Sequence, residues 1–345
     1  MGLRKNYRSL TATEKARFID ALKQLKANGT VNQFASMHAA HFTMNIHRSS
    51  HFLPWHREML LRFERELQKS HPDIAIPYWD SSTDGSANGP LWDQSFLGQF
   101  DSAWNLGRTL DADVLPTPQQ VQTNQTRATY ATFWPELENP IHNAPHRWVG
   151  GVMAGTASPG DPVFYLHHCW IDMLWARWQA AHPGTPFVQS APGTGLNDPL
   201  MEWPDRTPAN VLDHHALGYA FDWEPVPVGP RAVGDDMQPG EVLGPDQSIT
   251  SANGRFTLIY QADGNLVLYG PAGPLWASNT DGKPVGVCIM QGDGNLVIYG
   301  PGSLYVWDTG TDGNPGSRLV VQDDGNVVVY RADGTPAWAS NSVQP

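Results

Sequence analysis

The last third of the chain contains three copies of one short segment. The copies, QADGNLVLYG, QGDGNLVIYG and QDDGNVVVY, begin at Gln261, Gln291 and Gln322, so they lie 30 and 31 residues apart. The tryptophans that follow the copies recur every 31 residues: Trp276, Trp307 and Trp338. Since one copy is too short to bury its apolar face alone, this period predicts a repeat architecture in which each unit packs on its neighbours.

Each copy follows the pattern QxDxNxVxY. Side chains on a strand alternate between its two faces, so the pattern predicts one polar row and an apolar face that carries residues such as Leu266 and Leu268. Amide, carboxylate and phenol groups at fixed spacing suit the hydroxyls of a sugar. The residues predicted to bind carbohydrate are Gln261, Asp263, Asn265, Tyr269, Gln291, Asp293, Asn295, Tyr299, Gln322, Asp324, Asn326 and Tyr330.

These repeats resemble the bulb-type mannose-binding lectin domain, an all-β prism of four-stranded sheets around a core of tryptophans. The resemblance covers about residues 235 to 345. It implies shallow pockets for mannose-type glycans that gain strength through multivalency. The alternative is a prism that covers an active site or forms a homodimer contact.

The rest of the chain has a different composition. All thirteen histidines lie between His38 and His215. The segment TATEKARFIDALKQLKANG predicts a helix that begins at a Thr cap and ends at Gly29. A stretch rich in Pro and Gly, EPVPVGPRAVGDDMQPGE, reads as a linker. We therefore expect a first domain at 1–228, a linker at 229–236 and the prism at 237–345.

Several histidines occur at spacings that suit a metal. In ENPIHNAPHRW, His142 and His146 are four residues apart, so on a helix they share one face. HRSSHFLPWHREML places His47 and His56 nine residues apart, with His38 nine residues upstream, and DPVFYLHHCWID ends in His167 and His168. Clusters that contain only imidazole favour copper or zinc.

Three motifs, FLPWHRE, HNxxHxWVGG and SPGDPVFYLHHCWID, resemble the tyrosinase family of type-3 copper proteins over about residues 3 to 225. The resemblance implies a mainly α-helical dicopper domain that uses O2 to ortho-hydroxylate monophenols and to oxidise o-diphenols to o-quinones. It also implies two copper ions. One is held by His38, His47 and His56, and the other by His142, His146 and His168. His41 is an alternative to His38, and the FxxxH pattern of the family favours His38.

Further roles follow from the same resemblance. Glu138 and Asn143 match residues that hold a water for deprotonation of a phenol, with capping or bridging of a helix start as the alternative. Phe164 matches an aromatic that stacks at the copper site, with an ordinary core Phe as the alternative. Arg147 departs from the small residue that is common in bacterial relatives, and its charge could attract phenols that carry a carboxylate, or the side chain could simply face solvent. The rival functions are a catechol oxidase or an o-aminophenol oxidase without monophenolase activity.

Charge and hydropathy limit the partners. With 34 acidic and 22 basic residues, the net charge of −12 offers little to nucleic acid or an anionic membrane. No apolar run is long enough to span a bilayer, and the first residues lack the apolar core of a signal peptide. We expect a cytoplasmic protein, with carrier-assisted secretion as an alternative. The family resemblance also allows a separate copper-delivery protein.

Overall fold

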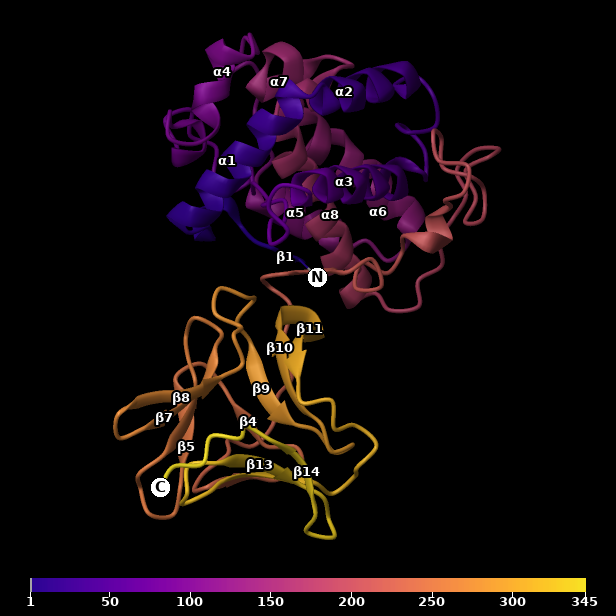
Figure 1. Cartoon of the computed structure of the whole chain (residues 1–345). Coiled ribbons are helices and arrows are strands. Elements are labelled where there is room, and N and C mark those ends of the chain that lie inside the picture. Colours follow the sequence, from indigo (N-terminus) through magenta and orange to yellow (C-terminus); the bar gives the residue numbers. More distant parts are fainter. Residues whose placement is uncertain (1) are drawn as a thin grey trace. The chain divides into compact units, whose positions relative to one another are not determined.

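A computed structural model describes residues 2–345, which fall into two compact units (Figure 1). One unit comprises residues 4–217, and the other comprises 218–345 together with Gly2 and Leu3. This division precedes the boundary expected at residue 228, because strand β2 (Tyr219–Phe221) pairs with the N-terminal strand β1 (Gly2–Arg4). Among residues 2–345, no helix combines the length and apolar character needed to cross a membrane.

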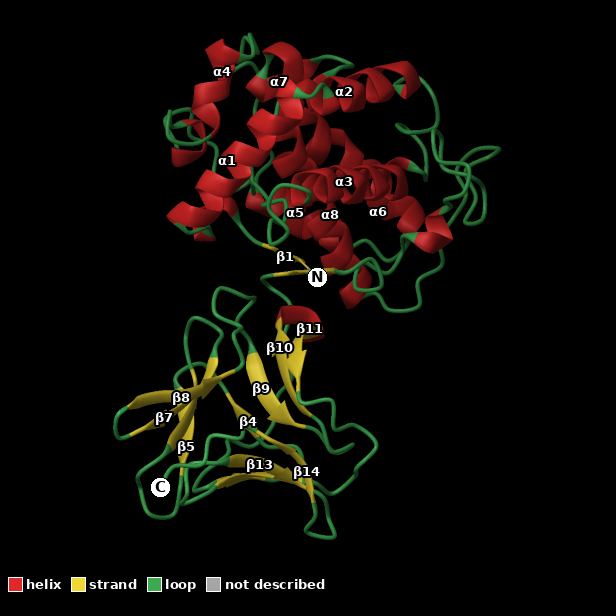
Figure 2. Ribbon diagram, viewed as in Figure 1, coloured by secondary structure: helices red, strands yellow, loops and turns green. Residues whose placement is uncertain are grey.

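The unit at 4–217 is helical, as predicted (Figure 2). Its α-helices are α1 (Ala12–Ala27), α2 (Thr30–His41), α3 (Phe52–Gln68), α4 (Phe100–Ala103), α5 (Pro118–Gln125), α6 (Tyr130–Glu136), α7 (Asn143–Val149) and α8 (Val163–Ala181). Short helical segments are η1 (Tyr7–Ser9), η2 (Pro90–Trp92), η3 (Leu97–Gln99), η4 (Leu137–His142), η5 (Gly151–Ala154), η6 (Ser158–Gly160) and η7 (Pro208–Asn210).

Local sequence sets the limits of the first helix. Thr11 accepts a hydrogen bond from the backbone of Glu14, and the Glu14 side chain accepts one from the backbone of Thr11, so the two form a capping box. Gly29 follows with a φ of +86°, a left-handed conformation that glycine adopts without steric cost. The predicted helix and its ends are thus confirmed, and α2 begins directly after the turn.

A buried ion-pair network joins α3, α8 and the start of the helical unit. Asp172 on α8 accepts from Arg57 on α3 at 2.6 Å and from Arg4 at 2.9 Å, and Arg4 also donates to Glu64 at 3.0 Å. None of these four side chains is more than 4% exposed. Charges so far from water are tolerated only when they are paired, so this network fixes how α3 and α8 approach each other.

The unit at 218–345 contains three four-stranded antiparallel sheets, as the prism predicts (Figure 2). The first sheet has the order β5 (Gln247–Thr250), β6 (Thr257–Tyr260), β7 (Leu266–Gly270), β8 (Gly273–Ala277). The second has β11 (Leu304–Asp308), β10 (Leu296–Gly300), β9 (Val287–Met290), β4 (Val242–Leu243), and η8 (Pro301–Ser303) lies between β10 and β11. The third has β14 (Pro336–Ala339), β13 (Val327–Tyr330), β12 (Arg318–Val321), β3 (Asp236–Met237).

The repeats meet in a shared core. Leu266 and Leu268 are fully buried there, as expected. The three repeat tryptophans contact one another, with ring centroids 5.4–6.3 Å apart. This arrangement confirms that each unit buries its apolar face against its neighbours.

The prediction that the whole QxDxNxVxY motif lies along one strand is wrong. In the first repeat, Gln261, Asp263 and Asn265 precede β7 and lie in the turn that joins β6 to β7. Gly264 has a φ of +89°, and the Asp263 carboxylate accepts from the backbone N–H of Asn265 at 3.0 Å. A left-handed residue interrupts the extended backbone, so only the Val and the Tyr of the motif belong to the strand.

We predict that Asp172→Ala lowers the free energy of unfolding of the helical unit by about 3–5 kcal/mol, because it leaves two buried guanidinium groups without their shared carboxylate. Chemical denaturation followed by circular dichroism measures this loss.

The matched control removes an ion pair at the surface. In the pair Arg127–Glu136, the side chains are 38% and 43% exposed, so Glu136→Ala should cost less than about 1 kcal/mol. If both variants lost the same free energy of unfolding, the buried network would not contribute more to stability than a surface ion pair.

Candidate metal centre

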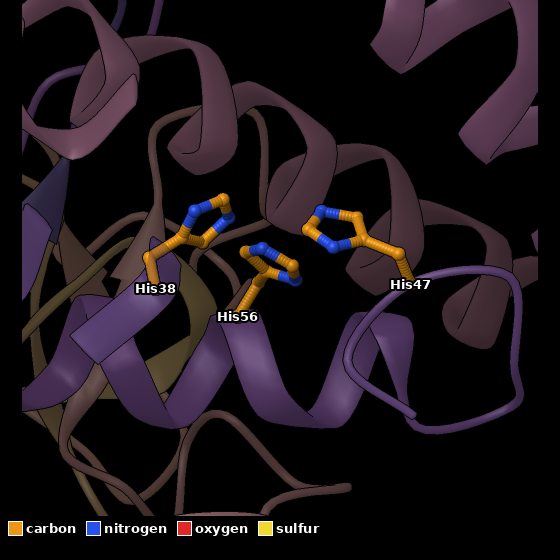
Figure 3. Close-up of side chains that lie close together, drawn as sticks. All are labelled: His38, His47 and His56. Atoms are coloured by element: carbon orange, nitrogen blue, oxygen red, sulfur yellow. The ribbon is translucent and has the colours of Figure 1, made fainter. Parts of the chain in front are cut away.

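Two groups of three histidines converge in the helical unit. His38 comes from α2, His47 from the loop after it, and His56 from α3; in Figure 3 the three rings turn toward a common space. His142 ends η4, His146 lies on α7, and His168 lies on α8. Within each group one nitrogen per ring lies within 4.8 Å of the others. The fold therefore brings together both sets of histidines that the sequence singled out.

The second triad shows what such a site requires. The Nε2 atoms of His142, His146 and His168 are 3.1–3.3 Å apart. A neutral imidazole with its proton on Nδ1 presents only a lone pair at Nε2, so three such atoms facing one another repel. A cation between them removes the repulsion.

Backbone carbonyls select that tautomer for three of the rings. The Nδ1 atoms of His38, His56 and His146 lie 2.6–2.8 Å from the carbonyl oxygens of Thr156, Phe52 and Met153, respectively. When Nδ1–H donates to a carbonyl, Nε2 is left free to bind a metal. The Nε2 atoms of His38 and His56 are buried without a hydrogen-bond partner, which fits residues made to hold an ion.

Burial keeps these histidines neutral. It lowers the pKa of His38 and His146 to about 4 and, together with the neighbouring histidines, lowers that of His47 to about 3. The pKa values of His56, His142 and His168 also fall well below the usual range, mainly through burial. The neutral imidazole is the form that binds metal, so the site needs no proton release near pH 7.

The two triads adjoin each other. The rings of His56 and His168 stack with centroids 4.3 Å apart. Phe164 is fully buried and contacts both triads, with its centroid 4.0 Å from that of His168 and 5.4 Å from that of His38. Two metal ions held in this way would be close neighbours.

Comparison with known proteins agrees with this geometry. The family model "common central domain of tyrosinase" matches residues 28–111 and 101–181. The tyrosinase of Streptomyces antibioticus is 40% identical over 276 residues, which cover 64% of this chain and 100% of that protein. The chain belongs to the tyrosinase family. Its cofactors are two copper ions, and the two histidine triads are suited to hold them.

Other relatives extend this picture. The tyrosinase of Streptomyces glaucescens is 39% identical, covering 64% of this chain and 99% of that protein, and the grixazone synthase of Streptomyces griseus is 31% identical with the same two coverages. Together with the family match, these similarities show that the chain is a copper-dependent phenol oxidase. A functional unit of octopus hemocyanin, 24% identical, covers 64% of this chain and 68% of its own with a TM-score of 0.50, which shows the shared fold alone.

The prism unit also has a similar solved structure. The mannose-specific agglutinin of snowdrop bulbs is 37% identical and covers 32% of this chain and 99% of its own, with a TM-score of 0.27. The three four-stranded sheets and the cluster of three tryptophans in this chain define its β-prism.

Two other histidines, His41 and His167, lie near the triads but belong to neither. The Nε2 atom of His41 lies 2.8 Å from a carboxylate oxygen of Glu202, so this ring is engaged outside the triad that contains His38. His167 lies behind the second triad, where its Nε2 is 3.0 Å from the carbonyl oxygen of His142. It supports the backbone of a predicted ligand.

Glu138 and Asn143 line a cavity of about 360 Å³ together with His47. Both carboxylate oxygens of Glu138 accept from the backbone N–H of Arg48, at 2.8 and 3.0 Å, and burial raises the pKa of Glu138 to about 7. The Oδ1 atom of Asn143 lies 3.0 Å from Nδ1 of His142. The tyrosinase-type cavity thus holds a histidine, a carboxylate of nearly neutral pKa and an amide.

Sequence reasoning missed two of these contacts. It did not foresee that Asn143 orients the ring of His142, nor that Glu138 is held by the backbone of Arg48. The carbonyls that fix the tautomers were missed as well. Backbone atoms have no signature in a sequence, so only a structure could reveal these partners.

Arg147 is half exposed and donates to the carboxylate of Asp113. The charge of Asp113 offsets that of Arg147, and this argues against attraction of acidic phenols by Arg147. Phe164, in contrast, is fully buried against the histidines. Contact of either residue with a substrate stays a prediction.

We predict that His38→Ala lowers the copper content from two ions per chain to about one, because a copper left with two imidazoles loses a third of its protein ligands. Metal analysis after dialysis against a weak chelator measures this change.

His41→Ala is the matched control, since it removes a neighbouring histidine of α2 that is paired with Glu202 instead. It should keep both copper ions. Loss of copper from His41→Ala with full loading of His38→Ala would reverse the assignment.

Proposed function

We propose that this phenol oxidase is a full tyrosinase, which hydroxylates monophenols at the ortho position and oxidises o-diphenols to o-quinones. The observation that supports it is the cavity shared by His47, Glu138 and Asn143. In this proposal His38, His47 and His56 hold one copper ion, and His142, His146 and His168 hold the other. Bound copper supplies the activation and reduction of O2.

The overall reaction converts one monophenol and one O2 into one o-quinone and one water. One oxygen atom enters the ring, and the other leaves as water with the two hydrogens removed from the substrate. A phenol must first lose its hydroxyl proton, whose pKa is near 10. This chain must therefore provide a base within the cavity.

Glu138 is the group suited to accept that proton. General base catalysis is most effective when the pKa of the base lies near the working pH, and burial brings the pKa of Glu138 to about 7. Its carboxylate lines the cavity that His47 reaches, so it can act directly or through one water.

Asn143 has two tasks in this proposal. Its Oδ1 accepts from Nδ1–H of His142, which fixes the ring with Nε2 toward the other two nitrogens of its triad. Its amide N–H groups remain to orient the water that passes the proton to Glu138. The same side chain would thus position both a copper ligand and the base.

A catechol oxidase or o-aminophenol oxidase without monophenolase activity is the second candidate. It is favoured by the two hydrogen bonds between Glu138 and the backbone of Arg48, the residue directly after His47. Arg48 has a φ of +53°, a conformation that costs energy for this residue, and Glu138 holds it in place. In that case Glu138 would serve only to support the loop that carries His47.

We predict that Glu138→Gln lowers kcat/KM for a monophenol such as tyramine by about 100-fold, the usual contribution of a general base. Oxidation of 4-methylcatechol should fall much less. The Gln side chain keeps an acceptor for Arg48 but cannot take a proton, so it separates catalysis from support of the loop. Quinone absorbance and copper content measure both effects, and equal losses on the two substrates with full copper would favour the second candidate.

The pH profile gives a second readout of the same residue. Glu138 accepts a proton only when ionised, so monophenol turnover should fall as the pH drops through its pKa. The positive charge of bound copper lowers this pKa, and the acid limb is expected at or below pH 7. Glu138→Gln should remove this limb.

We also propose that the prism unit binds mannose-type glycans. Each repeat places its Gln Nε2 within 2.7–3.1 Å of the hydroxyl of its Tyr, so an amide and a phenol lie side by side in every copy. Each motif Asp uses one carboxylate oxygen to hold its own turn, which leaves the other oxygen for a ligand hydroxyl.

We predict that the full chain binds immobilised mannan and that methyl α-D-mannoside, but not methyl α-D-galactoside, releases it. Surface plasmon resonance measures both steps. Asp324→Asn should weaken binding, because the amide replaces an acceptor with a donor. If both glycosides released the protein from mannan equally well, the result would argue against recognition of mannose.

A further inference from the structure

The proposed sugar pocket of the second repeat differs from the other two on the outer face of its sheet. The motif Val of each repeat lies on the outer face of its strand, directly opposite one residue of the next strand. The facing pairs are Val267 with Ala277, Val297 with Asp308, and Val328 with Ala339. Directly opposed side chains in an antiparallel pair stand on the same face, so the second repeat places a carboxylate where the other two have a methyl group.

The motif Asn is anchored in the same way in all three repeats. Its Oδ1 accepts from a hydroxyl and from a backbone N–H of the segment after the repeat tryptophan. These donors are Ser278 and Thr280 for Asn265, Thr309 and Thr311 for Asn295, and Ser340 and Ser342 for Asn326. The Nδ2 group of each Asn is therefore the side that remains for a ligand.

In the second repeat, the Nδ2 group of the motif Asn already donates to a protein acceptor. Nδ2 of Asn295 donates to Oδ2 of Asp308 at 2.9 Å. Within residues 2–345, Nδ2 of Asn265 and of Asn326 has no comparable protein acceptor, since Ala277 and Ala339 stand in place of Asp308. Asn295 is also the only motif Asn of the three that is buried, at 5% exposure.

A second difference accompanies Asp308. Tyr305 faces Tyr299 of the motif, whereas the first and third repeats have Pro274 and Pro336 at this place. Partial burial and the charge of Asp308 raise the pKa of Tyr305, so the carboxylate and this phenol are neighbours. Both changes fall on the face that would receive the sugar.

We infer that the prism binds mannose-type glycans through its first and third repeats, and that Asp308 closes the second. This inference rests on the proposed carbohydrate binding. A sugar hydroxyl that approaches Asn295 has to break a hydrogen bond to a charged acceptor, which is stronger than a neutral one. Affinity at the second repeat should therefore be at least about tenfold lower than at the other two.

The side-chain amide signals of Asn265, Asn295 and Asn326 in the full-length copper-loaded protein provide the test. They are followed by two-dimensional NMR during titration with methyl α-D-mannoside. We expect the signals of Asn265 and Asn326 to shift with similar Kd values, while that of Asn295 shifts only at about tenfold higher sugar or not at all. Asp308→Ala should bring the second repeat to the affinity of the other two.

Ala277→Asp is the matched control, because it builds the carboxylate into the first repeat. The Asn265 signal should then lose its response, with that of Asn326 unchanged. A wild-type Asn295 signal that titrates with the same Kd as the others would overturn the inference but leave carbohydrate binding intact. A silent Asn295 in Asp308→Ala, beside two responding repeats, would also overturn it. No shift at any of the three amides would reject both the inference and the carbohydrate role.

Discussion

The helical unit depends on holding six neutral imidazoles close together away from water. Burial lowers the pKa of every one of them, so they meet as uncharged ligands. Their nitrogen lone pairs still repel, and the fold must offset that cost. It does so with buried ion pairs that align α3 with α8, and with backbone carbonyls that orient the rings of His38, His56 and His146.

A buried ion pair holds together two of the helices that carry the histidines. Asp172, four residues after His168 on α8, binds Arg57, the residue next to His56 on α3. One buried contact thus aligns a predicted ligand of each copper ion. The position of His47 depends on a loop instead, and Glu138 holds that loop through Arg48. A group proposed as the catalytic base therefore also helps to build the site, and only a change that preserves its shape can separate the two roles.

The prism unit uses repetition differently. Three sheets pack against one shared core, with their partly buried tryptophans in contact, and this core requires the copies to remain alike on the inner face. The outer face has no such constraint. There the second repeat carries Tyr305 and Asp308 in place of the proline and alanine of the other two copies. Equal cores can thus support unequal pockets.

The sequence determined the two architectures, the tryptophan period, and the six histidines, because periodicity and side-chain chemistry follow from residue types and spacing alone. It also favoured His38 over His41, and the structure places only His38 in a triad. It misplaced Gln261, Asp263 and Asn265, because a left-handed glycine turns the chain before the strand begins. Only the tertiary structure decided three contacts: Glu138 with Arg48, Asn143 with His142, and Asn295 with Asp308. The first joins a side chain to a backbone N–H, and the other two join side chains whose rotamers the local sequence does not specify.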